Sequence, residues 1–488
     1  MRARNWLSAA STWWVKGGDL PKILLLLAVA IGVRAVLASP FWGDPMYDIV
    51  LGRWILAHGH VPLHDHWSWT FPGAGWVDQE WGWQVILAAA AAFGPYVLYG
   101  VGALFAAVLP FFIYLLAREL GSAKGPSALF SLLPIILMAP FLNLRPQVFG
   151  YDALVIFLWL LARERNGKGG LFWVVPLTLL WAQMHGSFVF VPCFIALALI
   201  LAWPWKLGLV ENRGFPYPWR LVAAFFAAAL VSFANPNGLG LWTDVVSMTG
   251  SPAIHQYITE WGPPSLGNPA GEFWWFIPVG AVLGVLLFAP KPRIDAYGLV
   301  LAVGCVWESF SSERMLPYAL IAVFGFLFGS LQWGETKRFR LPWLNALFAL
   351  TLITYLFLIW PYPASTLAAT VRTGGKYGMP KQAIKCVLAR HLQRVAFLYD
   401  LSAYAMWAGI PTMIDTRSDF FLNQGLFLPY SQVEEGEKPP APFFHQWRVG
   451  AAVWRQNTTV TQELVSAGWR PVCQSKGMVV LLPVLGRR

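Results

Sequence analysis

The stretch GDPMYDIVLGRWILAHGHVPLHDHWSWT, from Gly43 to Thr70, decides the fold of this chain. It follows the first apolar segment and begins the longest polar interruption in the apolar part of the sequence. Its acidic and histidine side chains are Asp44, Asp48, His58, His60, His64, Asp65 and His66. Because they follow directly on an apolar segment, we expect them to lie just outside a bilayer and to form the floor of a reaction site.

The composition indicates an integral membrane protein. The chain has 488 residues, of which 57% are hydrophobic and 12% charged, whereas soluble domains carry about 25% charged residues. The apolar residues come in long runs, and helices satisfy their own backbone polar groups in lipid. We therefore predict a polytopic α-helical membrane protein. The net charge of +11 is explained by basic residues in cytoplasmic loops, so we expect no nucleic-acid partner.

Eleven apolar runs predict membrane-spanning helices. They lie near residues 21–38, 96–117, 126–141, 146–162, 170–184, 186–204, 220–234, 273–290, 294–310, 315–333 and 341–361. The run Trp81–Phe93 is shorter and ends at Gly94 and Pro95. We predict that this run lies along the interface, because the tryptophans around it suit the depth of the headgroups.

The basic residues give the orientation of these spans. With this set of helices, one side of the membrane part contains most of the lysines and arginines. The other side contains few, chiefly Arg53, Arg145 and Arg314. The basic side is cytoplasmic by the positive-inside rule. Residues 1–20 are then cytoplasmic, and an odd number of spans places the C-terminal tail outside.

The character of the sequence changes near residue 362. Residues 21–361 form the membrane domain, in which 39–95 are a large first outer loop, and residues 362–488 contain the charges and turns of a soluble domain. In this tail KQAIKCVLARHL, SAYAMWAG and QNTTVTQELVSAGW predict helices, and RVAFLYD, PTMID and MVVLLP predict strands. This alternation indicates a small α/β domain. Cys386 and Cys473 both fall in it, and the sequence leaves their pairing open.

Asp44 is the first candidate for catalysis. It stands just past the first span, and Asp48 follows one helical turn later, so both carboxylates can share a face. A carboxylate near the membrane surface can take a proton from an acceptor hydroxyl or amine, or hold a divalent cation beside a phosphate. The alternative is a solvated helix start, with Asp44 as the N-cap and Pro45 at the first helical position.

The segment HGHVPLHDH, residues 58–66, contains side chains of the metal-binding type. Its four histidines and one aspartate can bind Zn²⁺ or Mn²⁺. Their spacing matches no tetrahedral motif, however, and the glycine and proline among them are typical of an irregular loop. Asp65 is the candidate in this segment for contacting substrate or for ordering the loop.

Further polar side chains fall at the outer ends of predicted helices. Arg145, in FLNLRPQVFG, suits a phosphate, although an arginine there can also snorkel to the interface. His185, in AQMHGSF, either contacts substrate or hydrogen-bonds inside the bundle. Glu260, beside a tryptophan, either binds a sugar or lies in a surface loop. Glu313 and Arg314, in SSERMLP, form another charged pair that can be satisfied internally.

Several of these motifs resemble a known family. The pattern Asp44, Gly52-Arg53-Trp54-Ile55, Gly59, Pro62, Asp65, Ser68 and Thr70 resembles the first outer loop of bacterial integral membrane proteins of the GT-C glycosyltransferase superfamily. Other similar motifs are Arg145-Pro146-Gln147, His185-Gly186, Asn235-Pro236 with Gly238, Glu260-Trp261, Ile414-Asp415-Thr416-Arg417 and Gly468-Trp469. The resemblance covers nearly the whole chain.

This resemblance implies a GT-C fold whose site opens at the outer leaflet of a bacterial inner membrane. It implies a donor sugar linked to polyprenyl phosphate and an acceptor that is a lipid, a glycan or a protein. The catalytic aspartate of the superfamily's first loop falls on Asp44, and Arg145 is placed to contact the donor phosphate. Metal dependence varies among GT-C enzymes, so a divalent cation such as Mg²⁺ or Mn²⁺ stays open.

We therefore expect an inverting glycosyl transfer, with Asp44 as base or acceptor-orienting carboxylate and Arg145 opposite the leaving phosphate. The residues expected around the sugar and the acceptor are Asp48, Asp65, His185 and Glu260.

A second hypothesis is a non-catalytic subunit of a membrane complex that retains a GT-C-like scaffold, because fold does not fix activity. It is supported by Pro45, which follows Asp44 where members of the superfamily often carry a second acid. A transporter of lipid-linked intermediates fits less well, because few ionisable residues fall inside the spans.

Overall fold

The structure is a computed structural model that describes residues 20–39, 41, 43–264, 269–288, 294–334, 381–475 and 477–483. Its internal contacts divide the chain into two compact units. Unit 1 comprises Met1–Ser39, Tyr99–Ala234 and Thr259–Ala364, and unit 2 comprises Pro40–Leu98, Asn235–Ile258 and Ser365–Arg488. Most of the predicted first outer loop therefore belongs to the same unit as the tail, although the membrane part separates them in sequence.

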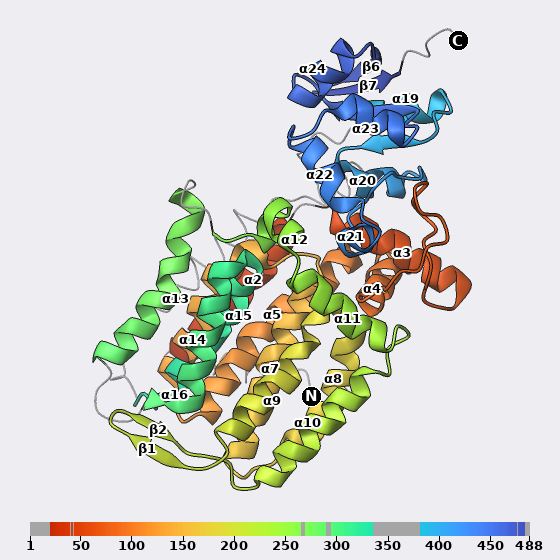
Figure 1. Cartoon of the computed structure of the whole chain (residues 1–488). Coiled ribbons are helices and arrows are strands. Elements are labelled where there is room, and N and C mark those ends of the chain that lie inside the picture. Colours follow the sequence, from red (N-terminus) through yellow and green to blue (C-terminus); the bar gives the residue numbers. More distant parts are fainter. Residues whose placement is uncertain are drawn as a thin grey trace, which may run out of the picture. The chain divides into compact units, whose positions relative to one another are not determined.

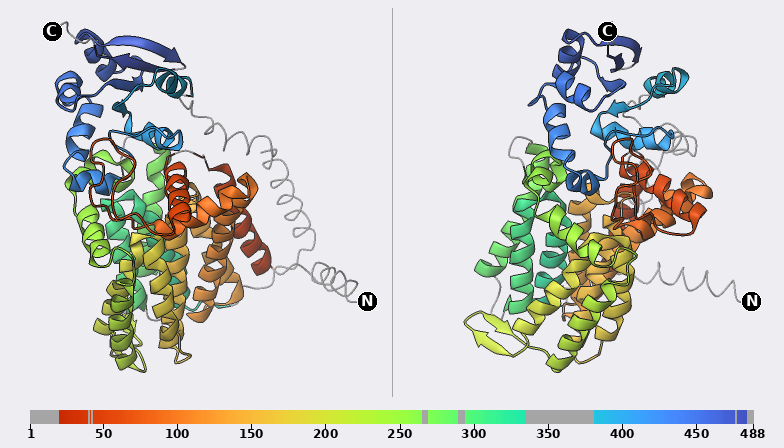
Figure 2. Two further views of the ribbon diagram at one scale, coloured as in Figure 1. Left: turned by 90° about the vertical axis from the view of Figure 1, so that its right-hand side faces the viewer. Right: turned by 45° about the vertical axis from the view of Figure 1, so that its right-hand side comes forward.

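Unit 1 is a bundle of apolar helices that run side by side (Figures 1 and 2). They are α2 (Leu20–Ala38), α5 (Pro95–Glu119), α6 (Lys124–Met138), α7 (Gln147–Arg165), α8 (Leu171–Met184), α9 (Phe190–Ile200), α10 (Pro218–Ser232), α13 (Pro269–Phe288), α14 (Ala296–Ser311), α15 (Leu316–Leu320) and α16 (Phe328–Ser330). A π-helical turn, Ile321–Leu327, continues α15 into α16. Short 3₁₀ turns are η1 (Ala139–Phe141), η2 (Gly186–Val189), η3 (Thr259–Trp261) and η4 (Glu313–Met315).

These helices confirm the polytopic helical fold class. Every predicted span up to residue 333 coincides with a helix or a run of helical turns, and the span at 341–361 lies outside the described residues. Within the described part of the chain, three helices are long and apolar enough to cross a membrane, namely Leu20–Ala38, Pro95–Glu119 and Lys124–Phe141. Apolar helical segments of 10–17 residues include Leu171–Met184, Pro218–Ser232 and Ala296–Ser311.

A small sheet fixes one end of this bundle. Strand β1 (Trp205–Leu207) pairs antiparallel with β2 (Val210–Asn212), which pairs parallel with β3 (Ile294–Asp295). Arg165, in the last turn of α7, reaches Asp295 at 2.6 Å and Asn212 at 3.2 Å. Both members of the Arg165–Asp295 pair are buried, so the pair ties the end of α7 to the start of α14.

Unit 2 combines the first loop with the tail. Its helices are α3 (Asp44–His58), α4 (Trp81–Ala92), α11 (Leu239–Thr249), α12 (Pro252–Tyr257), α19 (Lys381–Ala389), α20 (Tyr399–Trp407), α21 (Ser418–Asn423), α22 (Phe427–Glu434), α23 (Pro440–Gln446) and α24 (Thr459–Ser466). Its strands are β4 (Val395–Phe397), β5 (Ala451–Arg455), β6 (Arg470–Ser475) and β7 (Met478–Leu482). The sheet order is β4-β5-β7-β6, with β4 parallel to β5 and the other pairs antiparallel.

Most of the predicted tail elements are present. Helices α19, α20 and α24 and strands β4 and β7 fall where the sequence predicts them. Thr458 caps α24 by accepting a hydrogen bond from the N–H of Thr461, and Gly468 follows its end in a left-handed conformation. The predicted strand PTMID is wrong, because this segment lies outside the four-stranded sheet and forms an isolated bridge at Thr412. Strand β5 was not predicted and takes the central place beside β4.

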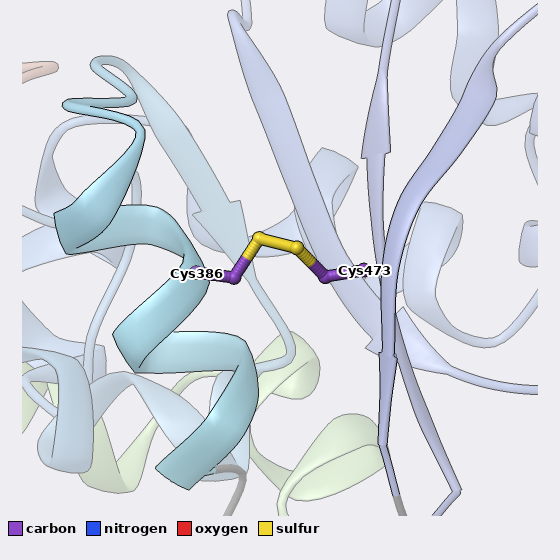
Figure 3. The surroundings of a disulfide bond; sticks show 2 residues. All are labelled: Cys386 and Cys473. Atoms are coloured by element: carbon purple, nitrogen blue, oxygen red, sulfur yellow. A yellow bond between two sulfur atoms is a disulfide. The ribbon is translucent and has the colours of Figure 1, made fainter.

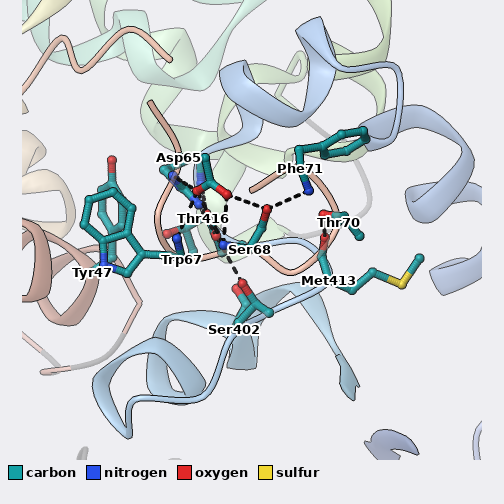
Figure 4. Close-up of polar contacts among 12 residues, drawn as sticks. Tyr47, Asp65, Trp67, Ser68, Thr70, Phe71, Ser402, Met413 and Thr416 are labelled. Atoms are coloured by element: carbon teal, nitrogen blue, oxygen red, sulfur yellow. Dashed lines mark hydrogen bonds and ion pairs between the residues drawn. The ribbon is translucent and has the colours of Figure 1, made fainter. Parts of the chain in front are cut away.

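The segment PTMID pairs with the first loop instead. Ser68 and Thr412 form an isolated parallel bridge, and the Thr70 hydroxyl donates a hydrogen bond to the Met413 carbonyl at 2.7 Å (Figure 4). The backbone N–H of Trp69 donates to the carbonyl of Thr412. Two segments that are far apart in sequence thus share hydrogen bonds that a regular strand would give to its own sheet.

Within the first loop, α3 and α4 pack at very short distance. Gly52 of α3 permits this, because a Cβ atom there would lie 2.0 Å from the carbonyl oxygen of Gln84. Gly59 ends α3 in a left-handed conformation, and its N–H donates to the carbonyl of Ile55, as is usual for a C-terminal glycine cap. The pair α3–α4 is therefore a compact helical hairpin that positions Asp44 and Asp48.

A disulfide joins Cys386 of α19 to Cys473 of β6 (Figure 3), and Cys193 and Cys305 are free thiols. The bond answers the question that the sequence leaves open. It closes a loop of 87 residues, and a loop of that size restricts the unfolded chain strongly. It holds helix α19 against the edge strand of the sheet.

Removing this disulfide should destabilise the tail. We expect the double variant Cys386→Ser/Cys473→Ser to lose about 2–4 kcal/mol of unfolding free energy, because the unfolded chain regains the entropy of the open loop. Pulse proteolysis of the full chain in urea measures this loss, with Cys193→Ser as the control. An unfolding midpoint equal to that of the control would show that the bond contributes nothing to the fold.

Candidate functional site

The six predicted site residues are divided between the two units. Unit 2 contains Asp44, Asp48 and Asp65, and unit 1 contains Arg145, His185 and Glu260. Each group is described within its own unit.

Asp44 is the first residue of α3, and Gly43 is the N-cap in its place. The alternative that Asp44 caps this helix is therefore wrong, although Pro45 does stand in the first turn. A carboxylate in the first turn is stabilised by the positive end of the helix dipole. Asp44 is partly exposed, whereas Asp48, one turn later, is fully buried. The two carboxylates of α3 thus stand in different surroundings.

Helix α20 of the tail packs along α3 in unit 2. Near the C-terminal end of both helices, the Arg53 guanidinium lies 4.7 Å from the centre of the Trp407 ring. Near their N-terminal end, burial raises the pKa of Tyr399 and Asp400, and the negative charge of Asp44 raises the pKa of both further. The tail therefore supplies the immediate surroundings of Asp44.

Asp65 orders the loop that contains it (Figure 4). Its Oδ2 accepts hydrogen bonds from the hydroxyl and the N–H of Ser68, at 2.6 and 3.1 Å, and its Oδ1 accepts one from the N–H of Trp67. Its Oδ1 also lies 2.7 Å from Nη1 of Arg417, and both side chains are inaccessible to solvent. Arg417 in turn binds Asp415 through Nε and Nη2, at 2.8 and 2.7 Å.

The histidines of the first loop do not converge on a metal position. The rings of His58 and His66 both stack on Trp54, with centroids 4.1 and 4.9 Å away. Nδ1 of His58 contacts the carbonyl of Trp54, and Nδ1 of His60 contacts that of Val61. Across the described residues, no group of three or more histidine, cysteine or acidic side chains is arranged to hold a metal ion.

Unit 2 also gathers three carboxylates that sequence reasoning missed. Asp78 comes from the first loop, Asp244 from α11 and Asp419 from α21, and the first two are almost fully buried. Gln84 donates a hydrogen bond to Oδ1 of Asp78 at 2.9 Å, and Asn423 donates one to Oδ1 of Asp244 at 3.5 Å. The three acids lie far apart in sequence, and no local motif connects them.

The pKa values of these three carboxyl groups are raised toward neutral pH. Burial raises the pKa of Asp78 to about 7, of Asp244 to about 8 and of Asp419 to about 6, and the charge of Asp419 raises the first two further. The neighbouring amide and backbone donors lower these pKa values only in part. The cluster can therefore hold or exchange protons in the pH range in which an acid–base group works.

Unit 1 brings two arginines to one carboxylate. Nη1 of Arg145 lies 2.6 and 2.7 Å from the two oxygens of Glu260, and the N–H of Arg145 donates to Oδ1 of Asn143 in the turn before α7. Nε of Arg314, in η4, lies 3.8 Å from Glu260, and its guanidinium lies 4.9 Å from the centre of the Trp261 ring. Sequence reasoning placed Arg314 beside Glu313 only, and missed this contact.

The cluster is charged and partly accessible. The exposed fractions of the side chains are 21% for Arg145, 18% for Arg314 and 44% for Glu260. Burial raises the pKa of Glu260, but Arg145 and Arg314 lower it more, so that its pKa lies below the ordinary value. Glu260 is therefore ionised at neutral pH.

His185 stands in the turn between α8 and η2, near the two arginines. Its Nδ1 contacts the hydroxyl of Ser187 at 2.7 Å, and Nε1 of Trp181 donates to the same hydroxyl at 3.0 Å. Gly150 of α7 allows this approach, because a Cβ there would lie 2.8 Å from the Ser187 hydroxyl. Burial lowers the pKa of His185 to about 3, and the charges of Arg314 and Arg145 contribute. His185 is thus a neutral hydrogen-bonding group.

No protein-family model and no curated protein matches the sequence of this chain. Solved structures do match. The archaeal oligosaccharyltransferase AglB from Archaeoglobus fulgidus, in complex with an inhibitory peptide and a dolichol-phosphate, has a TM-score of 0.53 at 13% identity, over 90% of this chain and 69% of that one. Its apo form has a TM-score of 0.52 at 13% identity, over 91% and 70% of the two chains.

ArnT from Cupriavidus metallidurans, bound to undecaprenyl phosphate, has a TM-score of 0.52 at 12% identity, over 95% of this chain and 98% of that one. At 12–13% identity, these matches show that the chain shares the fold of the three structures. The chain has the GT-C fold. The fold that the sequence motifs imply is therefore confirmed, and the roles of individual residues stay proposals.

The acid cluster should make unit 2 less stable as the pH rises. A carboxyl group whose pKa is higher in the folded than in the unfolded chain stabilises the fold below the unfolded value, and this contribution is lost as the pH rises through the folded value. For Asp78, whose pKa rises from 3.8 to about 7, this window lies between pH 4 and pH 7. The unfolding free energy of Asp78→Asn, taken relative to that of the wild type, should therefore be higher at pH 8 than at pH 5 by on the order of 2 kcal/mol.

Thermal unfolding of the purified chain at the two pH values measures this effect, with the surface variant Glu463→Gln as the control. If Asp78→Asn and the control show the same change between pH 5 and pH 8, Asp78 is not protonated in the folded chain.

Proposed function

We propose that this chain is a membrane glycosyltransferase that moves a sugar from a polyprenyl-phosphate-linked donor to a lipid, glycan or protein acceptor at the outer face of an inner membrane. The observation that supports the proposal most is the Arg145–Glu260–Arg314 cluster of unit 1 on a GT-C fold. Arginine is the side chain best suited to phosphate. Two structures with this fold are described with a dolichol-phosphate and with undecaprenyl phosphate.

In this proposal Arg145 binds the phosphate of the donor. When the bond between the sugar and the phosphate breaks, negative charge develops on the departing phosphate oxygen. A guanidinium held in place by Glu260, on a backbone whose N–H donates to Asn143, needs little reorganisation to stabilise that charge, which is the condition for electrostatic catalysis. Arg145 is therefore proposed to lower the barrier to departure as well as to bind.

Asp44 is proposed as the base. Its carboxylate takes the proton of the acceptor hydroxyl or amine while the acceptor atom forms a bond with the anomeric carbon of the sugar. The bond from that carbon to the phosphate oxygen breaks at the same time, which releases polyprenyl phosphate and inverts the configuration. Partial exposure of Asp44 at the start of α3 suits a group that must meet an acceptor.

The other candidates are proposed to position these two residues. Asp65 orders the first loop through Ser68 and Arg417, and Asp48 lies buried one turn below Asp44. His185 is proposed as a neutral hydrogen-bonding group beside the donor. The Cys386–Cys473 disulfide supports an extracytoplasmic tail, because such bonds persist in oxidising compartments.

Substitutions at Asp44 and Arg145 separate binding from transfer. Asp44→Asn should keep donor binding and reduce transfer by about 10²–10⁴-fold, because it removes only the proton acceptor. Arg145→Ala should weaken binding of undecaprenyl methyl phosphate, a singly charged phosphodiester, as well, whereas Arg145→Lys should retain part of it. Native mass spectrometry measures binding, and a screen of undecaprenyl-phosphate sugars with membrane lipid acceptors measures transfer.

The matched control is Asp400→Asn, which removes a neighbouring carboxylate in the same unit. Near-normal transfer by a folded Asp44→Asn variant would contradict the role of Asp44. Lipid-phosphate binding that depends on Arg145, without transfer to any acceptor, would favour the non-catalytic subunit instead.

A further inference from the structure

The second arginine at the proposed phosphate site raises the question of how much negative charge the site accepts. Arg145 comes from the turn before α7, Glu260 from η3 and Arg314 from η4, so three separate segments of unit 1 build one cluster. Glu260 lies within 2.6 Å of one guanidinium and 3.8 Å of the other. Its carboxylate therefore already occupies part of the space in which two arginines would surround an anion.

The charges of this cluster can be counted. Arg145 and Arg314 contribute two positive charges, and the ionised Glu260 cancels one of them. His185 adds none, because burial and the two arginines keep it neutral. Glu313 adds no positive charge, and burial and then the charge of Glu260 raise the pKa of its carboxyl group. The cluster therefore has at most one positive charge for a ligand.

Lipid-linked donors differ in the number of negative charges that they carry. A sugar joined to a lipid through one phosphate is a phosphodiester with one negative charge, whereas a sugar joined through a diphosphate has two. A second ligand charge would lie close to the Glu260 carboxylate, and like charges repel strongly in a partly buried site.

We propose that Glu260 is a specificity-determining residue that restricts the phosphate site to singly charged phosphodiesters. The donor is then a lipid monophosphate sugar and not a lipid diphosphate sugar. This inference rests on the proposed function, because it assumes that Arg145 binds the donor phosphate. It changes the expected role of Glu260 from a sugar contact to a counter-charge between two arginines.

Two sugar-free probes of matched shape test the proposal on the full chain in nanodiscs. Undecaprenyl methyl phosphate carries one negative charge, and undecaprenyl methyl diphosphate carries two. We expect the wild type to bind the first about tenfold more tightly than the second. Glu260→Gln should remove this preference by tightening the diphosphate, whereas Glu260→Asp, which retains the charge, should keep it.

The outcomes test the role of Glu260 separately from the proposed binding of the donor phosphate by Arg145. If the wild type binds both lipids equally, or the diphosphate more tightly, and Arg145→Ala loses both, then the phosphate site stands and the role of Glu260 is overturned. An unchanged preference in Glu260→Gln overturns that role too. If neither lipid binds, or if binding is indifferent to Arg145→Ala, the proposed function fails and the inference fails with it. Millimolar inorganic phosphate as a competitor shows whether the site recognises the lipid or a free anion.

Discussion

The buried guanidinium of Arg417 is the constraint on which unit 2 depends. It lies between Asp415, which binds Nε and Nη2, and Asp65, which binds Nη1, and none of the three side chains is more than 1% exposed. An arginine at such depth is tolerated only when its charge is matched, and removing one partner of a buried pair typically costs about 3–5 kcal/mol. The first loop and the tail therefore stabilise each other through this guanidinium.

The remaining contacts between these segments are consistent with that constraint. The bridge between Ser68 and Thr412 places the first loop against the tail, and Phe71 packs between Phe420 and Trp447. Helix α3 then lies along α20, so that the surroundings of Asp44 are made by a segment more than 300 residues later. The tail therefore helps to position Asp44, the residue of the first loop that is proposed for catalysis.

The sequence predicts the local features of this fold and misses the long-range ones. Apolar runs locate the helices of unit 1, and Thr458 and Gly468 mark the two ends of α24, because hydrophobic periodicity and capping act within a few residues. The segment PTMID has the composition of a strand, yet its hydrogen bonds go to Trp67 and Trp69. No local pattern indicates that Asp65 contacts Arg417, that Asp78 and Asp244 both come near Asp419, or that Arg314 contacts Glu260. The tertiary fold brings these partners together. Burial then strengthens the interactions between their charges and shifts their pKa values.

Hydrogen–deuterium exchange of the full chain with the Arg417→Met substitution tests most directly whether the first loop and the tail fold as one unit. The methionine side chain is apolar and of similar length, so the change removes the charge and leaves Asp65 and Asp415 buried without it. Exchange should accelerate together in residues 65–76 and 412–423, while the exposed control Arg455→Met leaves both segments protected. Faster exchange in 412–423 with unchanged protection of 65–76 would contradict the account, because the loop would then be ordered without its partner.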